Sequence, residues 1–304
     1  MQSCLNDSLK KAEINMQSTN EIRRRIAAVE QTKKITGAME MVSSNRMRQV
    51  MSHIDQNREY FSNIRRAMRE LLTSFHDVSH PYFTGRPRHH TTFMVISGDK
   101  GLCGSHNASV LNFALERIKE TPNAALITLG NTAEEFFHTN GIFPDINMLG
   151  IAQDPTLPKA REVAGELTDL YENKLTDDIR VIYTSFYGES RGTPVEFRLL
   201  PIRLHDYDDV RDAETLQEIM YHPSAQSVFD MLVPQYTIGL IFGVMVQAYA
   251  SEHFARMNAM RSATTNAQDM LGGLRISYNL ARQSAITNEI AEITGAAEVL
   301  RNSK

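Results

Sequence analysis

Residues 271–300 read LGGLRISYNLARQSAITNEIAEITGAAEVL, and the spacing of their apolar side chains decides the fold. Apolar residues first recur at alternating intervals of three and four, at Leu271, Leu274, Tyr278, Ala281 and Ala285. Such intervals are typical of the seam of a coiled coil. A second run, offset by one residue, follows at Ile286, Ile290, Ile293, Ala297 and Leu300. The stretch therefore predicts a long helix that pairs with another helix through a stripe that drifts near its end.

The first part of the chain carries a compatible pattern. Residues 18–20 (Ser-Thr-Asn) are typical N-cap residues, and an apolar stripe follows at Ile22, Ile26, Val29, Ile35, Met39 and Val42. The stripe resumes at Phe61, Ile64, Met68, Leu71 and Phe75. In the middle of this arm polar residues occupy positions where the seam calls for apolar ones, namely Thr32, Lys33, Thr36 and Ser43. The two arms are predicted to pair antiparallel, because a folded middle joins them.

The placement of proline separates the arms from this middle. All 10 prolines lie between Pro81 and Pro234, and proline removes a helix hydrogen bond and clashes with the preceding turn. We therefore expect the first helix to end near His80-Pro81 and the last to begin after Pro234. The Gly272-Gly273 pair lowers helix propensity, and it is expected to mark a bend or a close approach of the other arm.

The middle of the chain is predicted to be an open, mostly parallel α/β sheet, because strand-like and helix-like stretches alternate. Strands are expected at 91–97, 124–129, 179–187 and 195–202, and helices at 108–119, 131–139 and 159–175. The fold class is thus mixed, with a long antiparallel coiled coil of N- and C-terminal helices and a central Rossmann-like α/β domain. We expect four segments: an extension (1–15), a coiled-coil helix (16–80), the α/β domain (81–210) and a C-terminal helical region (211–304).

Composition excludes several classes of protein. The chain has 304 residues, is 42% hydrophobic and 22% charged, and carries a formal net charge of −4. These values are typical of a soluble globular protein and argue against a general nucleic-acid binder. The most apolar run, 236–250, is too short to span a bilayer, so no direct membrane insertion is expected. Two cysteines, Cys4 and Cys103, make no disulfide framework and favour a reducing compartment.

One loop occupies the place of a phosphate-binding loop. Gly98-Asp99-Lys100-Gly101-Leu102-Cys103-Gly104 follows a predicted strand and precedes a predicted helix. Its spacing matches neither G-x-G-x-x-G nor G-x-x-x-x-G-K-[ST]. A structural turn or a partner-contact loop is therefore favoured over nucleotide binding.

Other candidate chemistry is weaker. Cys103 with His106 lacks an orienting acid, so a packed thiol is favoured over a nucleophile. No Cys or acid cluster supports a metal site at His76, His80, His89 and His90. The pairs Glu134-Glu135 and Asp208-Asp209 are read as solvated surface. No catalytic residue, metal site or cofactor is expected.

Three segments resemble the gamma subunit of F-type ATP synthase, the central rotor shaft of that enzyme. They are EIRRRIAAVEQTKKITGAMEMVSSNRMR at 21–48, SGDKGLCGSHN at 97–107, and SEHFARMNAMRSATTNAQDMLGGLRISYNLARQSAITNEIAEITGAAEVL at 251–300. They occur in the order and spacing of the family, so the resemblance runs from about residue 20 to residue 300. Long collinear matches of this kind are far more specific than a short motif.

The resemblance implies a subunit that is not itself catalytic. A family member transmits torque between the ion-driven c-ring and the catalytic ring of alpha and beta subunits, coupling ATP synthesis or hydrolysis to ion translocation. The implied partners are one alpha3beta3 hexamer per gamma chain, the epsilon subunit and the c-ring. The implied location is peripheral, on the cytoplasmic face of the bacterial inner membrane.

The resemblance also carries over contact residues between rotor and stator. Met39 matches a methionine that faces an acidic lever of the beta subunit, and five polar residues of the last helix match ring contacts: Glu252, Arg256, Arg282, Gln283 and Thr287. The chain departs from many family members at Gly37, where they have lysine, and at Asn288, where they have glutamine. The dithiol insertion of the plastid relatives is missing, which argues against that route of redox control.

Two alternatives stay open from the sequence. The α/β domain belongs to an enzyme that binds a nucleotide at Gly98–Gly104, or the helices form a passive coiled-coil tether without a role in torque. Binding of ATP by the isolated chain would favour the first alternative, and truncation of residues 293–304 addresses the second. Co-purification with a nucleotide-binding hexamer at one copy per hexamer tests the rotor assignment itself.

Overall fold

The structure is a computed structural model that describes residues 2–74, 80–83, 86–87, 90–186, 191–202 and 222–302. Within the two terminal helices it describes the side chains of residues 19–52, 60, 62–71 and 225–298. The chain divides into two compact units, a coiled-coil unit (residues 1–41 and 259–304) and an α/β unit (residues 42–258). Helices α1 (Gln2–Ser74) and α5 (Ala225–Asn302) each run through both units without a break.

The α/β unit contains one five-stranded sheet in the order β3-β2-β1-β4-β5. Strands β1 (Thr91–Ile96), β2 (Ala124–Leu129), β3 (Ile146–Met148) and β4 (Asp178–Thr184) are parallel, whereas β5 (Pro194–Leu200) pairs antiparallel with β4. Helices α2 (His106–Glu120), α3 (Asn131–Thr139) and α4 (Leu157–Glu172) connect the parallel strands. The predicted open, mostly parallel sheet is confirmed, and β3 is a strand that the sequence reading missed.

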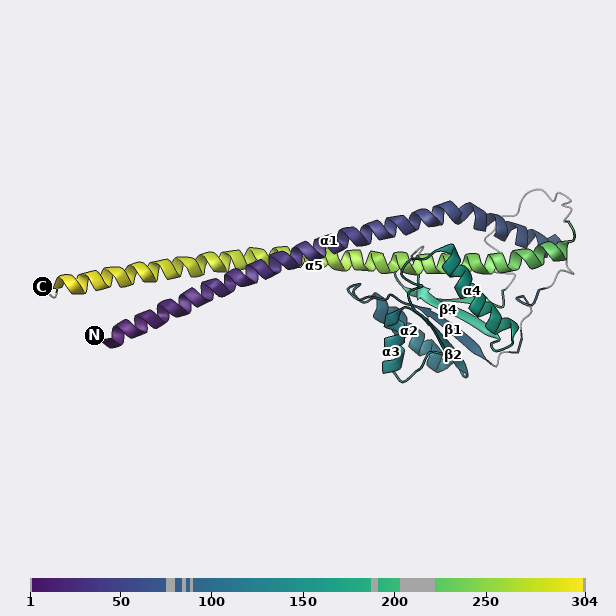
Figure 1. The fold of residues 1–304 in the computed structure, drawn as a ribbon, viewed down its shortest axis with the longest axis horizontal. Coiled ribbons are helices and arrows are strands. Elements are labelled where there is room, and N and C mark those ends of the chain that lie inside the picture. Colours follow the sequence, from purple (N-terminus) through teal and green to yellow (C-terminus); the bar gives the residue numbers. More distant parts are fainter. Residues whose placement is uncertain are drawn as a thin grey trace. The chain divides into compact units, whose positions relative to one another are not determined.

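Alternate side chains of the strands belong to two different hydrophobic cores, as expected for a sheet covered on both faces. Phe93 and Val95 of β1 pack with α2 and α3. Met94 and Ile96 pack instead with α4, α5 and the end of α1. Figure 1 shows α2 and α3 on one side of the strands and α4 on the other. The strand β1 is therefore buried on both faces, and the loop that follows it lies at the carboxyl edge of the sheet.

Helix α5 begins earlier than the sequence predicts. It starts at Ala225 and carries Pro234 inside it, so the expected start after Pro234 is wrong. Burial of Phe229, Val233 and Tyr236 on either side of the proline explains why the helix continues, because their packing compensates for the hydrogen bond that proline removes. Among the described residues, only this helix is long and apolar enough to cross a membrane by length and composition, and half of its 18-residue apolar window is buried inside the chain.

In the coiled-coil unit the two helices run antiparallel (Figure 1), as predicted. Leu271 is buried, and Leu274, Tyr278, Ala281 and Ala285 of α5 are half-buried. Ile286, Ile290 and Ile293 are exposed, which agrees with the predicted drift of the stripe.

The seam of α1 differs from the prediction. Ile35 is 52% exposed, whereas Thr36 is 8% exposed and faces α5. The same holds farther along α1, where Val42 is exposed and Ser43 is buried. The heptad register set by Ile22, Ile26 and Val29 thus continues through polar residues. The predicted polar seam positions at Thr36 and Ser43 are confirmed, whereas the predicted seam positions at Ile35 and Val42 are wrong.

The structure also bears on the predicted role of the Gly272-Gly273 pair and on the predicted limits of the segments. A Cβ placed on Gly272 or Gly273 would have nothing within 4 Å, so the expected close approach of the other arm at this pair is wrong. The predicted segment limits near 80 and 210 fall on or beside residues 75–79 and 203–221, which lie outside the described residues. Other residues named in the sequence analysis also lie outside them, namely His76, His89, Asp208 and Asp209 and the side chains of Phe61, Phe75 and Leu300.

Candidate functional site

The Gly98–Gly104 loop joins β1 to α2 and has an unusual backbone. Leu102 has a φ of 62°, as does Gly104. A positive φ suits glycine but strains a bulky L-residue. The Leu102 side chain is nevertheless 62% exposed. Strained conformations of this kind persist only where the surroundings over-determine them.

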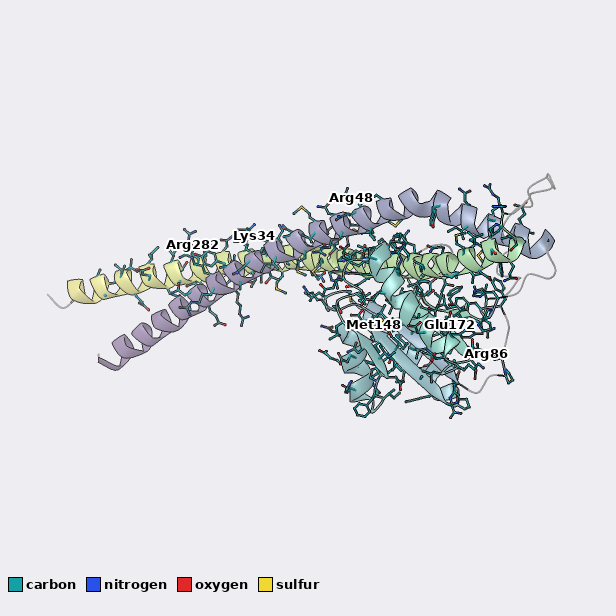
Figure 2. All side chains as sticks on the ribbon, turned by 45° about the vertical axis from the view of Figure 1, so that its right-hand side comes forward. Lys34, Arg48, Arg86, Met148, Glu172 and Arg282 are labelled. Carbon is teal, nitrogen blue, oxygen red and sulfur yellow. The ribbon has the colours of Figure 1, made fainter. Side chains whose placement is uncertain are left out.

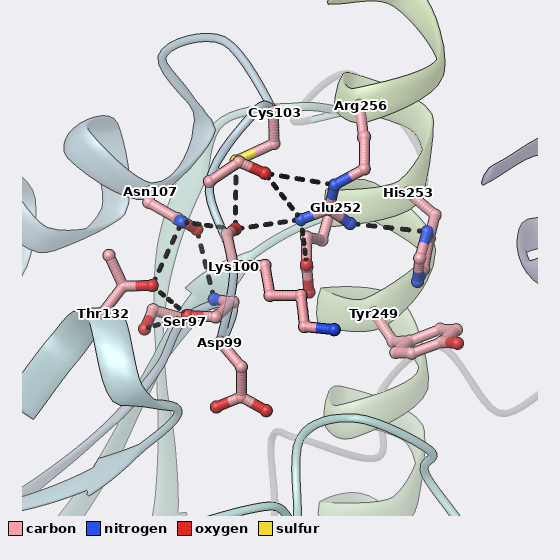
Figure 3. A network of polar contacts seen from close by, with 12 residues as sticks. Ser97, Asp99, Lys100, Cys103, Asn107, Thr132, Tyr249, Glu252, His253 and Arg256 are labelled. Atoms are coloured by element: carbon pink, nitrogen blue, oxygen red, sulfur yellow. Dashed lines mark hydrogen bonds and ion pairs between the residues drawn. The ribbon is translucent and has the colours of Figure 1, made fainter. Parts of the chain in front are cut away.

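The sheet side of the α/β unit holds the loop through side-chain hydrogen bonds (Figure 3). The Gly98 N–H donates to Oδ1 of Asn107 at 3.1 Å, and Nδ2 of Asn107 donates to the Lys100 carbonyl at 3.4 Å and to Oγ1 of Thr132 at 3.3 Å. The Thr132 hydroxyl in turn donates to the Gly98 carbonyl. Asn107 therefore spans the loop from its first residue to its third.

A second bond to the sheet side comes from the carboxylate of the loop itself. Oδ1 of Asp99 accepts from the N–H of Asn131 at the start of α3, at 2.8 Å. Asp99 thus ties the loop to the N-terminus of a neighbouring helix, where a carboxylate is favoured by the helix dipole.

Helix α5 holds the other side of the loop through Arg256. Its Nη2 donates to the Lys100 carbonyl at 2.9 Å, and Nη2 and Nε both lie 3.2 Å from the Gly101 carbonyl oxygen. Nη2 also pairs with Oε1 of Glu252 at 2.6 Å. The side chains of Arg256 and Glu252 are only 9% and 12% exposed. Figure 3 shows the guanidinium between the loop carbonyls and the Glu252 carboxylate.

The ionisable groups around this ion pair have shifted pKa values. Burial raises the pKa of Glu252, against the opposing effect of the Arg256 charge. Burial, together with the Arg256 charge, lowers the pKa of His253 to about 3 and that of His106 to about 4. Both imidazoles are therefore neutral near pH 7, and Arg256 is the cation of the cluster.

Cys103 is a buried free thiol, 3% exposed. Burial raises its pKa, which disfavours the thiolate that a nucleophile requires. Its carbonyl accepts from the His106 N–H at 3.3 Å, a backbone contact at the start of α2. The packed thiol predicted from the sequence is confirmed.

A small cavity lies beside the loop, lined by Ile96, Ser97, His106, Ala152, Met245, Ala248, Tyr249 and Glu252. Its volume of about 10 Å³ is close to the room that one water needs. Ligand pockets for drug-sized molecules measure roughly 300 Å³ or more, so this cavity is too small for a nucleotide. Among the residues that the structure describes, no group of three or more His, Cys, Asp or Glu is placed to hold a metal ion.

The structure brings together only part of the predicted site. Glu252 and Arg256 meet the 98–104 loop, a contact that the sequence reading did not foresee because more than 150 residues separate the partners. Met39 is half-buried on α1, and Arg282, Gln283 and Thr287 are exposed on α5. Figure 2 labels Arg282 on its helix. Arg282 belongs to the coiled-coil unit and follows Arg256 by 26 residues along α5.

Polar pairs across the two helices of the coiled-coil unit were also missed. Oγ1 of Thr36 lies 2.7 Å from Oγ1 of Thr264, and Nζ of Lys33 donates to Oε1 of Gln268. Two ion pairs flank them, Glu40–Arg261 at 2.8 Å and Glu30–Arg275 at 2.9 Å. The polar residues at seam positions of α1 were the feature of the sequence from which these cross-helix pairs could have been predicted.

Comparisons with known proteins agree with this architecture. A family model described as ATP synthase matches residues 18–300. The ATP synthase gamma chain of Heliobacterium modesticaldum is 34% identical over 289 residues, covering 94% of this chain and 100% of the relative. That of Enterococcus faecalis is 35% identical over 300 residues, covering 93% and 99%.

Solved structures share the fold. A chain of the Euglena gracilis mitochondrial ATP synthase (OSCP/F1/c-ring) matches with a TM-score of 0.65 at 14% identity, covering 95% of this chain and 96% of that one. A chain of the Tetrahymena thermophila central stalk and c-ring matches with a TM-score of 0.57 at 22% identity, covering 75% and 99%. Because the family model spans most of the chain and relatives above 30% identity align almost end to end, this chain belongs to the ATP synthase gamma chain family, as its three sequence segments indicated.

Proposed function

We propose that this chain is the central-stalk rotor subunit of an F1Fo ATP synthase. In this role it transmits torque between the ion-driven c-ring and the catalytic alpha/beta hexamer, so that ATP synthesis or hydrolysis is coupled to ion translocation. The observation that carries the proposal is the end-to-end match to gamma chains, together with two helices that each continue from an α/β unit into an antiparallel coiled coil.

The helix pair suits the transmission of torque for a physical reason. Each helix is a continuous run of backbone hydrogen bonds, and the two are tied by seam packing and by side-chain pairs of defined register. The chain can then favour one conformation of a surrounding subunit over another by contacting the two conformations differently.

We propose that the exposed residues of the coiled-coil unit make these contacts. Arg282, Gln283 and Thr287 present polar groups, while Ile286, Ile290 and Ile293 present an apolar face. Met39 on α1 belongs to the same proposal. Direct contacts of Glu252 and Arg256 with the ring stay a prediction, and both side chains are already engaged within this chain.

The proposal includes no catalytic residue and no cofactor in this chain. The partners are the alpha and beta subunits at one gamma chain per alpha3beta3 hexamer, the epsilon subunit and the c-ring. The location is peripheral, on the cytoplasmic face of a bacterial inner membrane.

Co-purification tests the proposal. A tagged chain expressed in its own cells should bring down a nucleotide-binding hexamer at one copy per hexamer, measured by native mass spectrometry. A homo-oligomer without such partners would overturn it. So would micromolar ATP binding by the isolated chain that is lost in Lys100→Ala, because that result assigns a nucleotide site to the 98–104 loop.

A further inference from the structure

We propose that Arg256 is a positioning residue, which, with Glu252, latches the Gly98–Gly104 loop to helix α5 so that loop and helix move as one body. The inference rests on the proposed function, since it says how one part of the rotor is held to another. It differs from a ring contact, because the partners of Arg256 lie inside this chain.

The geometry of Arg256 is that of a clamp on main-chain atoms. Its guanidinium reaches the carbonyl oxygens of two consecutive loop residues, Lys100 and Gly101, through three N···O contacts of 2.9–3.2 Å. The planar guanidinium presents several N–H donors in fixed directions, whereas a lysine ammonium is a point charge on a flexible stem. Two neighbouring carbonyls are therefore a target that arginine fits and lysine does not.

Glu252 keeps the buried cation in place. A buried charge is costly unless it is paired and hydrogen-bonded, and Glu252 supplies the counter-charge at 2.6 Å. The loop also comes close to this carboxylate, since a Cβ added to Gly98 would lie 2.8 Å from Cδ and Oε1 of Glu252. The ion pair thus touches the loop at its start and in its middle.

The loop needs such a clamp because its backbone is strained at an exposed position. Leu102 combines a φ of 62° with 62% exposure, so little packing holds its own side chain. The contacts that hold it come from either side, Asn107 on the sheet side and Arg256 on α5. Loss of the α5 side should free the loop while leaving the sheet intact.

The position of Arg256 along α5 determines which part of the helix the loop is attached to. The α/β unit ends at residue 258, and α5 continues into the coiled-coil unit as the same helix. The latch therefore joins the loop to the last turn of α5 that belongs to the α/β unit. A force on the loop reaches the helix at this turn directly.

Cys103 provides a built-in reporter for the latch. It is a loop residue, only 3% exposed, and a Cys4→Ser background leaves it as the only thiol. A maleimide can react with it only when the loop opens. The experiment measures the labelling rate of Cys103 on the full chain at pH 7.5, in wild type, Arg256→Gln and Arg256→Lys, with Arg261→Gln as the matched control on the same helix.

We expect both Arg256 variants to raise the labelling rate at least tenfold, with Arg261→Gln within twofold of wild type. The direction is decisive, because the Arg256 charge lowers the pKa of Cys103. Its loss in Arg256→Gln makes the thiolate scarcer, so electrostatics alone slows that reaction. Arg256→Lys keeps the positive charge but loses the planar set of guanidinium N–H donors. A Cys103 labelling rate equal to that of wild type in this variant would therefore overturn the proposal.

Urea separates a latch from general destabilisation. Loop opening exposes little surface, so the labelling rate of the Arg256 variants should be nearly independent of urea well below the unfolding transition. A rate that rises steeply with urea from zero denaturant, in parallel with global unfolding, overturns the proposal. If Arg256→Gln does not fold, Arg256→Lys and Glu252→Gln carry the same test.

The outcome is independent of the proposed function. Labelling is measured on the chain alone, so the latch can fail while the chain still co-purifies with a hexamer. The converse also holds, since a chain without such partners can still show the predicted rates.

Discussion

The hydroxyl oxygens of Thr36 and Thr264 lie 2.7 Å apart across the two helices of the coiled-coil unit. Thr36 is 8% exposed, and either hydroxyl can also donate to its own helix, to the Lys33 carbonyl at 3.2 Å or to the Met260 carbonyl at 2.8 Å. A hydrogen-bonded pair thus occupies a seam position where a coiled coil usually has an apolar one.

Replacing both threonines by valine should leave stability unchanged or raise it, because two apolar groups of the same shape then pack together. Thr36→Val alone should cost about 1 kcal/mol, since the cross-helix hydrogen bond is lost. The thermal midpoint of the helical signal at 222 nm measures both effects. Thr265→Val, at an exposed neighbouring position of α5, is the control. A double variant less stable than either single one would contradict the prediction.

Reversing one charge of the Glu40–Arg261 pair should weaken the coiled coil slightly. The Arg261 side chain is 62% exposed, so Arg261→Glu should cost at most about 1 kcal/mol. The swapped pair, Glu40→Arg with Arg261→Glu, should recover most of that loss at low salt, and the recovery should shrink in 1 M NaCl. Equal recovery at both salt concentrations would rule out an electrostatic origin.

Gly98→Ala should destabilise the α/β unit by about 1–3 kcal/mol, because the new Cβ would lie 2.8 Å from the Glu252 carboxylate. That carboxylate cannot move away freely while it pairs with Arg256. Gly101→Ala in the same loop is the matched control, since nothing lies within 4 Å of its Cβ position. Urea unfolding followed by tyrosine fluorescence compares the two, and equal midpoints would argue against a close approach at Gly98.

Acid should destabilise the chain through two histidines, His253, which is buried, and His106, which is half-buried. The folded-state pKa values of His106 and His253, about 4 and about 3, lie below the ordinary value of about 6.5. The unfolded chain therefore binds protons that the folded chain does not. Their contribution to stability is complete above pH 6.5 and is lost as the pH falls toward 4 and 3.

The measurement is the free energy of unfolding between pH 7.5 and pH 5. His253→Gln should flatten the fall, because the residue with the depressed pKa is then missing. Glu252, whose pKa is raised, acts in the opposite sense, because its folded state takes up a proton first. Arg256 and Arg46 keep their charge throughout. A His253→Gln profile as steep as that of wild type would contradict the assignment.

The sequence predicted the sheet well because its inner strands, β2, β1 and β4, are largely buried on both faces. Thr91–Ile96 and Ala124–Leu129 are apolar runs of strand length, and they leave little ambiguity. The strand Ile146–Met148 has three residues, too few for any periodicity. The early start of α5 was missed because Pro234 was taken as the boundary of the helix. The packing of the residues on either side of the proline, which keeps the helix continuous, cannot be seen in a sequence.

The helix seam and the candidate site were predicted only in part, for the same reason. The spacing placed Ile35 and Val42 in the seam as well as the polar residues Thr36 and Ser43. Only the polar residues, which continue the heptad register of Ile22 and Ile26, are buried. For the site, the loop and the Glu252–Arg256 pair were each singled out, yet nothing local in the sequence says that Arg256 meets the carbonyls of Lys100 and Gly101. Contacts between distant segments arise from tertiary packing alone.

The strained backbone at Leu102 also affects how a partner protein would bind to this loop. Its backbone is bent into an unfavourable conformation when the chain folds, and hydrogen bonds on either side maintain that shape. A protein that contacts this side chain therefore meets a preorganised surface. Association then loses less conformational entropy than docking onto a loose loop would, so affinity at this point depends on how firmly the rest of the chain keeps the loop in place.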